Sequence, residues 1–267
     1  MFLAHAARLR SSSLSRQVGA AICTSDGEIL SIGTNEVPRG GGGFYWPDSN
    51  PDKRDHVLGS DSNDSMTRQL IHDTIARLRD GGWLTGDVAS QSVEAIVSDA
   101  LKDPDGPLRS SRITNLIEFG RAVHAEMAAL SNAARFGVSI QKASMYVTTF
   151  PCHECARHIV ASGISRVVYI DPYPKSAVRE LFPDSISVDR IDDAPNRVSF
   201  QPYMGIAPII YPQMYAMRVR KNSEGKTVEW DGRTSEPIFA DLFDNIKRNE
   251  SYVMQRFASF NQQDLGI

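Results

Sequence analysis

The chain has 267 residues, of which 41% are apolar and 23% are charged, and these proportions are ordinary for a globular protein with a hydrophobic core. A formal net charge of −3 excludes an overall basic field for duplex nucleic acid, and no run approaches the ~18 apolar residues of a membrane-spanning helix. Three cysteines are too few for a secreted disulfide framework, and residues 1–17 show no signal-peptide pattern, so we expect a cytoplasmic protein without membrane or duplex partners.

The first predicted elements are a helix and a β-hairpin. Residues 3–9 (LAHAARL) favour a helix, and the serines at positions 11–13 end it. Residues 18–24 (VGAAICT) and 28–33 (EILSIG) are apolar runs, and the turn sequence SDG joins them. Asp-Gly between two such runs is a strong hairpin signal, so the runs are predicted to form two antiparallel strands.

A glycine run and a long insertion follow the hairpin. The four glycines at positions 40–43 predict a flexible loop; a phosphate-binding loop is the alternative, although the Lys-Ser/Thr of a P-loop is missing. Residues 44–120 contain a polar loop and then three stretches of apolar residues at helical spacing, which predict an insertion of about three helices. The recurring residues are Leu70, Ile71, Ile75 and Leu78, then Val93, Ile96, Val97, Ala100 and Leu101, and then Leu108, Ile113, Leu116 and Ile117.

The segment after the insertion alternates between helices and strands. Residues 123–135 and 152–162 predict helices, and residues 144–149 (SMYVTT) and 166–170 (RVVYI) predict buried strands. The buried stripe of the first helix is predicted to consist of Met127, Leu130 and Ala134. This succession predicts an α/β fold in which helices cover a mixed sheet.

The C-terminal part has a weaker pattern. Residues 177–181 (AVREL) predict a short helix, residues 186–191 (ISVDRI) a strand and residues 244–260 a terminal helix. Residues 202–219 are rich in aromatic residues, Met and Pro and predict a packed loop or a partner surface. We therefore expect one domain over residues 1–200, with the insertion at about 44–120, and a C-terminal extension over residues 201–267 packed on it.

Two short motifs carry the chemistry of the chain, HAE at positions 124–126 and PCHEC at positions 151–155. The imidazole of His124 and the thiolates of Cys152 and Cys155 are three of the four ligands of a catalytic zinc site, and an open fourth position takes a water. Glu126 is the proton carrier that such a water needs. The pairing H-x-E…P-C-x-x-C is the known signature of zinc nucleobase deaminases.

A C-x-x-C pair alone is also typical of a redox pair or of half of a structural zinc site. A redox pair needs neither His124 nor Glu126, and a closed structural site needs a fourth protein ligand. The remaining cysteine, Cys23, lies within a predicted strand and is expected in the core. His153 follows Cys152 directly, so its side chain is expected to point away from the metal. A catalytic zinc site is the favoured interpretation, and a non-catalytic zinc module for assembly is the alternative.

The motifs resemble those of the cytidine deaminase superfamily, and within it the deoxycytidylate deaminases. The similarity also includes the dipeptide RS at positions 10–11, SRQVGA at positions 15–20 and the pattern G-x-N-x-x-P-x-G at positions 33–40. It covers about residues 1–40 and 121–175. The resemblance implies a three-layer α-β-α fold around a central mixed sheet, a Zn²⁺ cofactor and hydrolytic deamination of a deoxycytidine nucleotide.

The resemblance also implies contacts to the nucleotide. Asn35 matches the family asparagine that hydrogen-bonds the sugar, and Ala125 and Pro151, inside the two motifs, are included among the expected substrate contacts. Tyr169 ends a predicted strand beside the site and is expected either to stack on the base or sugar or to belong to the core. Basic residues near the matched motifs are candidates for binding the phosphate, and we favour Arg16 and Lys175. The full set of candidates is Arg8, Arg10, Arg16, Arg39 and Lys175.

Residues 169–176 (YIDPYPKS) and 205–208 (GIAP) look like the deaminase domain of bacterial anti-phage deoxycytidylate deaminases. Those proteins deaminate dCTP and dCMP, which depletes the cytosine nucleotide pool during infection. They usually carry an N-terminal kinase-like P-loop domain and act as oligomers. The resemblance therefore implies a homo-oligomer. No Walker A motif stands in the 267 residues, so we expect a deaminase that either stands alone or belongs to a longer protein with such a domain.

Other interpretations stay open at this point. A second, structural zinc site would need a cysteine besides Cys23. The insertion carries no assignable motif and is expected to serve either allosteric nucleotide control or an oligomer contact. An editing deaminase for tRNA or single-stranded DNA shares the zinc residues but needs a basic or aromatic channel for flanking nucleotides. A free nucleoside deaminase is a weaker alternative, and the N-terminal motifs and the net charge of −3 favour a free nucleotide as substrate.

Overall fold

The structure, a computed structural model, describes residues 1–102, 104–189, 196–210 and 248–255. It divides into two compact units, Met1–Gly205 and Ile206–Ile267. The first unit contains the sheet, the two motifs and the insertion, and the second contains the short 3₁₀ helix η3 (Pro208–Ile210) and a helix over residues 248–255. Among the residues described, none of the helices combines the length and the apolar character needed to cross a membrane.

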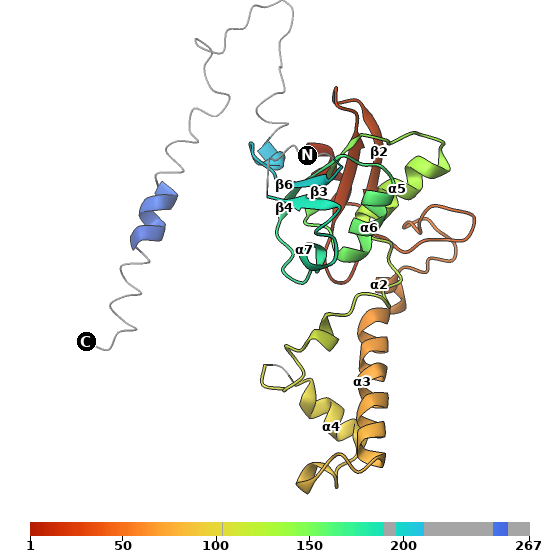
Figure 1. The fold of residues 1–267 in the computed structure, drawn as a ribbon, viewed down its shortest axis with the longest axis vertical. Helices are drawn as coiled ribbons and strands as arrows, with labels where there is room; N and C mark the ends of the chain where they lie inside the picture. Colours follow the sequence, from red (N-terminus) through yellow and green to blue (C-terminus); the bar gives the residue numbers. More distant parts are fainter. Residues whose placement is uncertain (103, 190–195, 211–247, 256–267) are drawn as a thin grey trace, which may run out of the picture. The chain divides into compact units, whose positions relative to one another are not determined.

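A six-stranded mixed sheet lies at the centre of the first unit (Figure 1). Its strands are β1 (Gly19–Cys23), β2 (Ile29–Thr34), β3 (Ser144–Thr149), β4 (Arg166–Asp171), β5 (Ile186–Val188) and β6 (Val198–Pro202), in the spatial order β2-β1-β3-β4-β6-β5. Strand β1 is antiparallel to β2 and to β3, whereas β3, β4, β6 and β5 run parallel to one another. The predicted α/β class and the predicted hairpin are confirmed. Strand β6 was not predicted, because only Val198 and Phe200 alternate as buried apolar residues in it.

Helices cover both faces of the antiparallel end of the sheet. A methyl group added at Gly19 would lie 2.0 Å from the carbonyl oxygen of Ala4 in α1 (Phe2–Arg8), and one added at Gly33 would lie 2.2 Å from that of Ala125 in α5 (Ala125–Arg135). Gly33 pairs with Ala20, the residue after Gly19, and successive residues of a strand face opposite sides. Helices α1 and α5 therefore lie on opposite faces, which gives the three layers α-β-α.

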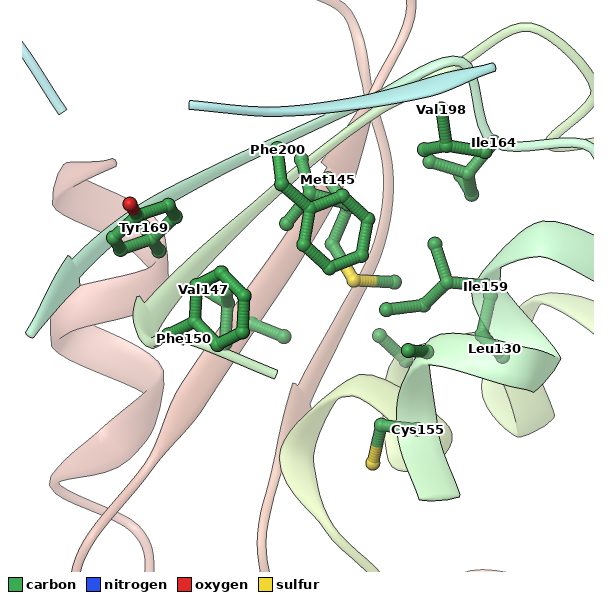
Figure 2. Close-up of a cluster of buried hydrophobic side chains, with 14 of the residues drawn as sticks. Leu130, Met145, Val147, Phe150, Cys155, Ile159, Ile164, Tyr169, Val198 and Phe200 are labelled. Carbon is green, nitrogen blue, oxygen red and sulfur yellow. The ribbon is translucent and has the colours of Figure 1, made fainter. Parts of the chain in front are cut away.

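The main core lies between strands β1, β3, β4 and β6 and the helices α5 and α6 (His153–Ala161). Figure 2 shows side chains of β3, β4 and β6 packed together with those of both helices. The ring of Phe150 lies edge-on to that of Tyr169 at a centroid distance of 4.9 Å and to that of Phe200 at 5.7 Å. Aromatic pairs in this geometry contribute beyond their buried area, so the chain just before the second motif is held firmly.

The buried stripe of α5 differs from the prediction. Leu130 is buried, but Met127 is only partly buried and Ala134 is exposed. The residues of α5 that are buried are mostly small: Ala125, Glu126, Ala128, Ala129, Leu130 and Ala133. The prediction from periodicity favours large apolar residues as the buried stripe of a helix. A helix that touches the backbone of a strand instead needs small residues such as alanine at the contact. The prediction for Ala134 was therefore wrong, and Met127 packs against the main core but is only partly buried.

The insertion consists of α2 (Asp55–Leu58), α3 (Ser62–Asp80), η1 (Gly86–Val88), α4 (Val93–Ala100) and η2 (Arg112–Asn115). Helices α3 and α4 pack around a separate small core of Ile71, Ile75, Val93 and Val97. The predicted number of about three helices agrees with α2, α3 and α4, but the third stretch of apolar residues, 108–117, contains only η2. The hydroxyls of Ser111 and Thr114 donate to the local carbonyls of Leu108 and Ser111, and such bonds compete with α-helical ones.

The remaining helices match their predictions where they are described. Helix α1 (Phe2–Arg8), helix α6 (His153–Ala161) and the short helix α7 (Val178–Leu181) lie where the sequence predicts helices. Of the terminal helix predicted over residues 244–260, residues 248–255 are described and are helical. Residues 211–219 of the predicted packed loop lie outside the described residues, and residues 208–210 form η3.

The contact between β2 and α5 predicts a large effect of one methyl group. We expect Gly33→Ala to destabilise the zinc-loaded protein by about 3 kcal/mol or more, because the added carbon would overlap the backbone of Ala125 and Ala129. The matched control is Gly40→Ala, since nothing lies within 4 Å of a methyl group at Gly40. Urea unfolding of both variants measures the difference, and equal midpoints would contradict the close approach of α5 to β2.

Candidate metal centre

Two helix N-termini bring the motif residues together. His124 is the N-cap residue of α5, and Cys152 is the N-cap residue of α6, immediately after Pro151 and the end of β3. Cys155 follows in the first turn of α6, where its backbone N–H donates to the Sγ of Cys152 at 3.4 Å. The unpaired N–H groups and the positive end of a helix favour a thiolate over a thiol at this position.

The three ligand atoms converge on one point. The Nδ1 atom of His124 lies 3.3 Å from the Sγ of Cys152 and 3.4 Å from the Sγ of Cys155, and the three ligand atoms lie within 4.8 Å of one another. Both cysteines are free thiols, 4% and 1% exposed. A buried set of one imidazole and two thiolates fits zinc in its chemistry, and with three protein donors it fits the open site of a catalytic zinc.

The proton positions of the ligands depend on one another. The hydrogen bond with Cys155, together with His124, lowers the pKa of Cys152 to about 4, and the hydrogen bond with Cys152 raises the pKa of His124 to about 9. Sharing a hydrogen bond with the Cys152 thiolate, together with burial, raises the pKa of Cys155. A metal needs deprotonated thiolates and a neutral imidazole, so zinc binding here releases protons.

Glu126 lies in the first turn of α5, two residues after His124, and is only 4% exposed. Burial is the largest cause that raises its pKa, to about 7, and the negative charge of Cys152 adds to the effect. A bound Zn²⁺ ion would act in the opposite direction because of its positive charge. A carboxyl group that titrates near neutral pH is suited to accept and return a proton.

The structure brings only some of the other predicted residues to the metal ligands. Ala125 and Pro151 are buried directly beside His124 and Cys152 in the chain. Asn35 is 6% exposed, and its side chain holds the backbone of the loop before β1: its Oδ1 accepts from Val18 N at 2.7 Å and its Nδ2 donates to Arg16 O at 2.8 Å.

The basic candidates differ in their surroundings. Arg16 and Lys175 are both exposed, whereas the guanidinium of Arg10 stacks on the ring of Trp46 at 4.3 Å, beside a small pocket that also contains Arg135. Arg8 is partly buried and Arg39 is exposed.

The loop that follows β4 also reaches the metal ligands. Ser176 donates to the carbonyl oxygen of Pro151 at 2.8 Å, which anchors this loop, including Tyr173 and Lys175, next to the second motif. Burial raises the pKa of Tyr173, with a further rise from the charge of Cys152 and an opposing effect of Arg16, so the charges of both residues act on this phenol. Tyr173 was not singled out from the sequence; its place between two prolines was the available signal.

Tyr169 belongs to the core, the second of its two expected positions. Its ring packs on Phe150, and its hydroxyl donates to the carboxylate of Asp189 at 2.6 Å. Cys23 lies in β1 and is partly buried, and burial raises its pKa. In the described part of the chain, neither Cys23 nor His153 belongs to the group of potential metal ligands.

Residues 1–171 match the protein family described as the cytidine and deoxycytidylate deaminase zinc-binding region. This match covers more than half of the chain, so the chain belongs to that family. Zn²⁺ is the cofactor for which His124, Cys152 and Cys155 are arranged.

Individual relatives match over shorter segments. The deoxycytidylate deaminase of Enterobacteria phage T2 is 50% identical over 54 residues, which are 20% of this chain and 29% of that protein. ComE operon protein 2 of Bacillus subtilis (strain 168) is 35% identical over 74 residues, 27% of this chain and 39% of that protein. In each case the chain spans less than half the length of the curated relative. The fold was also compared with a crystal structure of dCMP deaminase from the cyanophage S-TIM5 in complex with dCMP and dUMP. The matched region covers 75% of this chain and 90% of the cyanophage chain, with 16% sequence identity and a TM-score of 0.38.

The geometry of the centre predicts which cysteines hold the metal. We expect Cys152→Ala and His124→Ala to lose the zinc, about one ion per chain, because two remaining protein ligands are too few for a stable site. Cys23→Ala, the matched control, should keep the full zinc content, since Cys23 lies in β1 apart from the cluster. Metal analysis by mass spectrometry after gel filtration measures the content. Full zinc in Cys152→Ala, or its loss in Cys23→Ala, would contradict the assignment.

Proposed function

We propose that this protein is a zinc-dependent deaminase that converts a deoxycytidine nucleotide, dCMP or dCTP, to the deoxyuridine nucleotide and ammonia. The observation that carries the proposal is the convergence of His124, Cys152 and Cys155 beside the buried carboxyl group of Glu126. A purely structural zinc site has no use for that carboxyl group. The alternative of a non-catalytic zinc module is therefore less well supported.

In the proposed reaction Glu126 transfers the protons of a water that the metal activates. Zinc, when bound, acts as a Lewis acid that lowers the pKa of water. Glu126 accepts a proton as water adds to the ring carbon that carries the amino group, and it donates this proton to the neighbouring ring nitrogen. The remaining proton of the water then passes through Glu126 to the amino group, which leaves as ammonia while the new C–O bond becomes the carbonyl.

The surroundings of the centre support a nucleotide as substrate. The charges of Arg16 and Cys152 both act on the phenol of Tyr173, and Lys175 lies on the same anchored loop as Tyr173. We propose that Arg16 and Lys175 bind the phosphate and that Tyr173 contacts the base or sugar. Asn35 completes the set as the proposed sugar contact. An editing deaminase for tRNA or single-stranded DNA would need a channel of basic or aromatic residues, and the net charge of −3 favours the small substrate.

The proposed biological role follows from the resemblance of residues 169–176 and 205–208 to bacterial anti-phage deoxycytidylate deaminases. We propose a homo-oligomer that depletes the cytosine nucleotide pool during infection, alone or with a fused kinase-like P-loop domain. We also propose that residues 1–200 form the deaminase domain with its insertion at 44–120 and that residues 201–267 form an extension.

Turnover of a substrate panel tests the proposal. Zinc-loaded protein is incubated with dCMP, dCTP, deoxycytidine and a cytosine-containing single strand, and uracil products are quantified. Turnover of the phosphorylated monomers is the expected result, and the ratio of dCMP to dCTP rates then identifies the preferred substrate. Turnover of the single strand alone would assign the protein to the editing enzymes, and no turnover of any compound by zinc-loaded protein would contradict the proposal.

Glu126 provides the sharpest single test of the chemistry. We expect Glu126→Gln to keep its zinc and to lower kcat by a factor of about 1000, because an amide cannot carry the proton. The control Glu180→Gln changes an exposed carboxylate on α7 and should retain both zinc and activity. Zinc content and ammonia release are measured on the same samples. An active Glu126→Gln would refute the proton-transfer role.

Arg16 tests the recognition of the phosphate. We expect Arg16→Ala to raise the KM for dCMP about 10-fold and to leave the kinetics with deoxycytidine unchanged, because only dCMP has a phosphate for the guanidinium. Arg68→Ala removes an exposed arginine of α3 and serves as the control. An unchanged KM for dCMP in Arg16→Ala would exclude this arginine as the phosphate contact.

A further inference from the structure

Glu36 is a buried carboxylate in the segment that follows β2, and its side chain is only 1% exposed. It lies next to Asn35 in the chain but takes no part in the metal centre or in the proton transfer proposed above. Burying an ionised group is unfavourable unless it is fully hydrogen-bonded or paired. The contacts of Glu36 therefore indicate what this carboxylate holds in place.

The side chain of Glu36 binds a second segment of the chain. Its Oε2 accepts from the backbone N–H of Ser12 at 3.0 Å and from the Ser12 hydroxyl at 2.5 Å, and its Oε1 accepts from the backbone N–H of Val37 at 2.9 Å. All three partners are donors, which a carboxylate can satisfy and a glutamine amide cannot. The guanidinium of Arg54, which is 8% exposed, is paired with Asp52, and the negative charge of Glu36 adds to the rise in the pKa of Arg54.

The backbone of Glu36 binds a third segment. Its N–H donates to Val123 O at 3.2 Å, and its carbonyl accepts from Val123 N at 3.0 Å, so the two residues form an isolated antiparallel bridge. Val123 directly precedes His124, the N-cap of α5 and a metal ligand. Glu36 thus links Ser12 with Val123, the residue that precedes the metal ligand His124.

The segment around Ser12 is the loop that carries Arg16. Asn35 holds Val18 N and Arg16 O at the far end of this loop, and within it the side chain of Gln17 donates to Ser11 O at 2.7 Å. The side chain of Arg16 is exposed, so its position follows that of the loop backbone. Asn35 fixes one end of the loop and Glu36 fixes the other.

We propose that Glu36 is a positioning residue that holds the loop of Arg16 at a fixed place relative to His124, so that the phosphate and the base of one nucleotide are bound together. This inference rests on the proposed function, and it adds a residue that touches neither the substrate nor the metal. It assigns Glu36 to the discrimination between a nucleotide and a nucleoside, through the loop it holds.

A double-mutant cycle with two substrates tests the inference. KM and kcat for dCMP and for deoxycytidine are measured on the zinc-loaded wild type, Glu36→Ala, Glu36→Gln, Arg16→Ala and the double variant Glu36→Ala/Arg16→Ala. We expect Glu36→Ala to raise the KM for dCMP about 10-fold with kcat nearly unchanged, to leave deoxycytidine unaffected, and to add nothing further in the Arg16→Ala background. Glu36→Gln should fall between the wild type and Glu36→Ala, and Glu28→Ala, an exposed residue of the hairpin, should match the wild type. An equal loss for both substrates, or additive losses in the double variant, would overturn the inference.

Amide hydrogen exchange gives a readout that does not depend on activity. In Glu36→Ala with zinc bound, exchange at Ser12 and in the Arg16 loop should be faster than in Glu28→Ala, because the carboxylate that accepts from Ser12 is lost. Unchanged exchange would overturn the positioning role whatever the kinetics. If the wild type turns over neither substrate but exchange rises as expected, the proposed function fails while the attachment of the loop by Glu36 stands.

Discussion

The arrangement of the whole centre depends on the direct contact between α5 and the backbone of β2. Gly33 has no side chain, and Ala125 and Ala129 have short ones, so the helix lies against the strand itself. The hydroxyl of Ser31 donates to Ala129 O at 2.8 Å and fixes the register of this contact. Because His124 is the N-cap of the same helix, the contact also determines where the imidazole stands.

The second half of the centre follows from the topology of the parallel strands. Helix α6 connects β3 to β4, which run parallel, so its N-terminus begins at the carboxyl end of β3. Helix ends of this kind lie at the edge of the sheet where ligands bind in α/β proteins. Two helix N-termini therefore supply ligands that are 28 and 31 residues apart in the sequence, and their dipoles stabilise the negative charge on the sulfurs.

Much of this centre could be predicted from the sequence, because ligand spacing and ligand chemistry are local properties. HAE and PCHEC place a histidine, a carboxylate and two cysteines at fixed offsets, and strands such as SMYVTT are recognisable from their β-branched and aromatic residues. The buried face of α5 was not predictable in this way, since it depends on the absence of a side chain at Gly33, 92 positions before Ala125. The role of Glu36 was equally hidden, because its partners Ser12 and Val123 are distant in the sequence and Ser12 is an unremarkable loop serine.

The side chain of Asn35 holds a loop with only part of its hydrogen-bonding capacity. A carboxamide has two N–H donors and two acceptor lone pairs, and the bonds to Arg16 O and Val18 N use one of each. The other N–H and the other lone pair are the right complement for a sugar hydroxyl, which both donates and accepts. If Asn35 binds the sugar as proposed, then sugar recognition and the placement of Arg16 share one amide group, with Glu36 beside it fixing the same loop at Ser12. Loss of either side chain would then change how tightly the nucleotide is held before it changed the chemistry at Glu126.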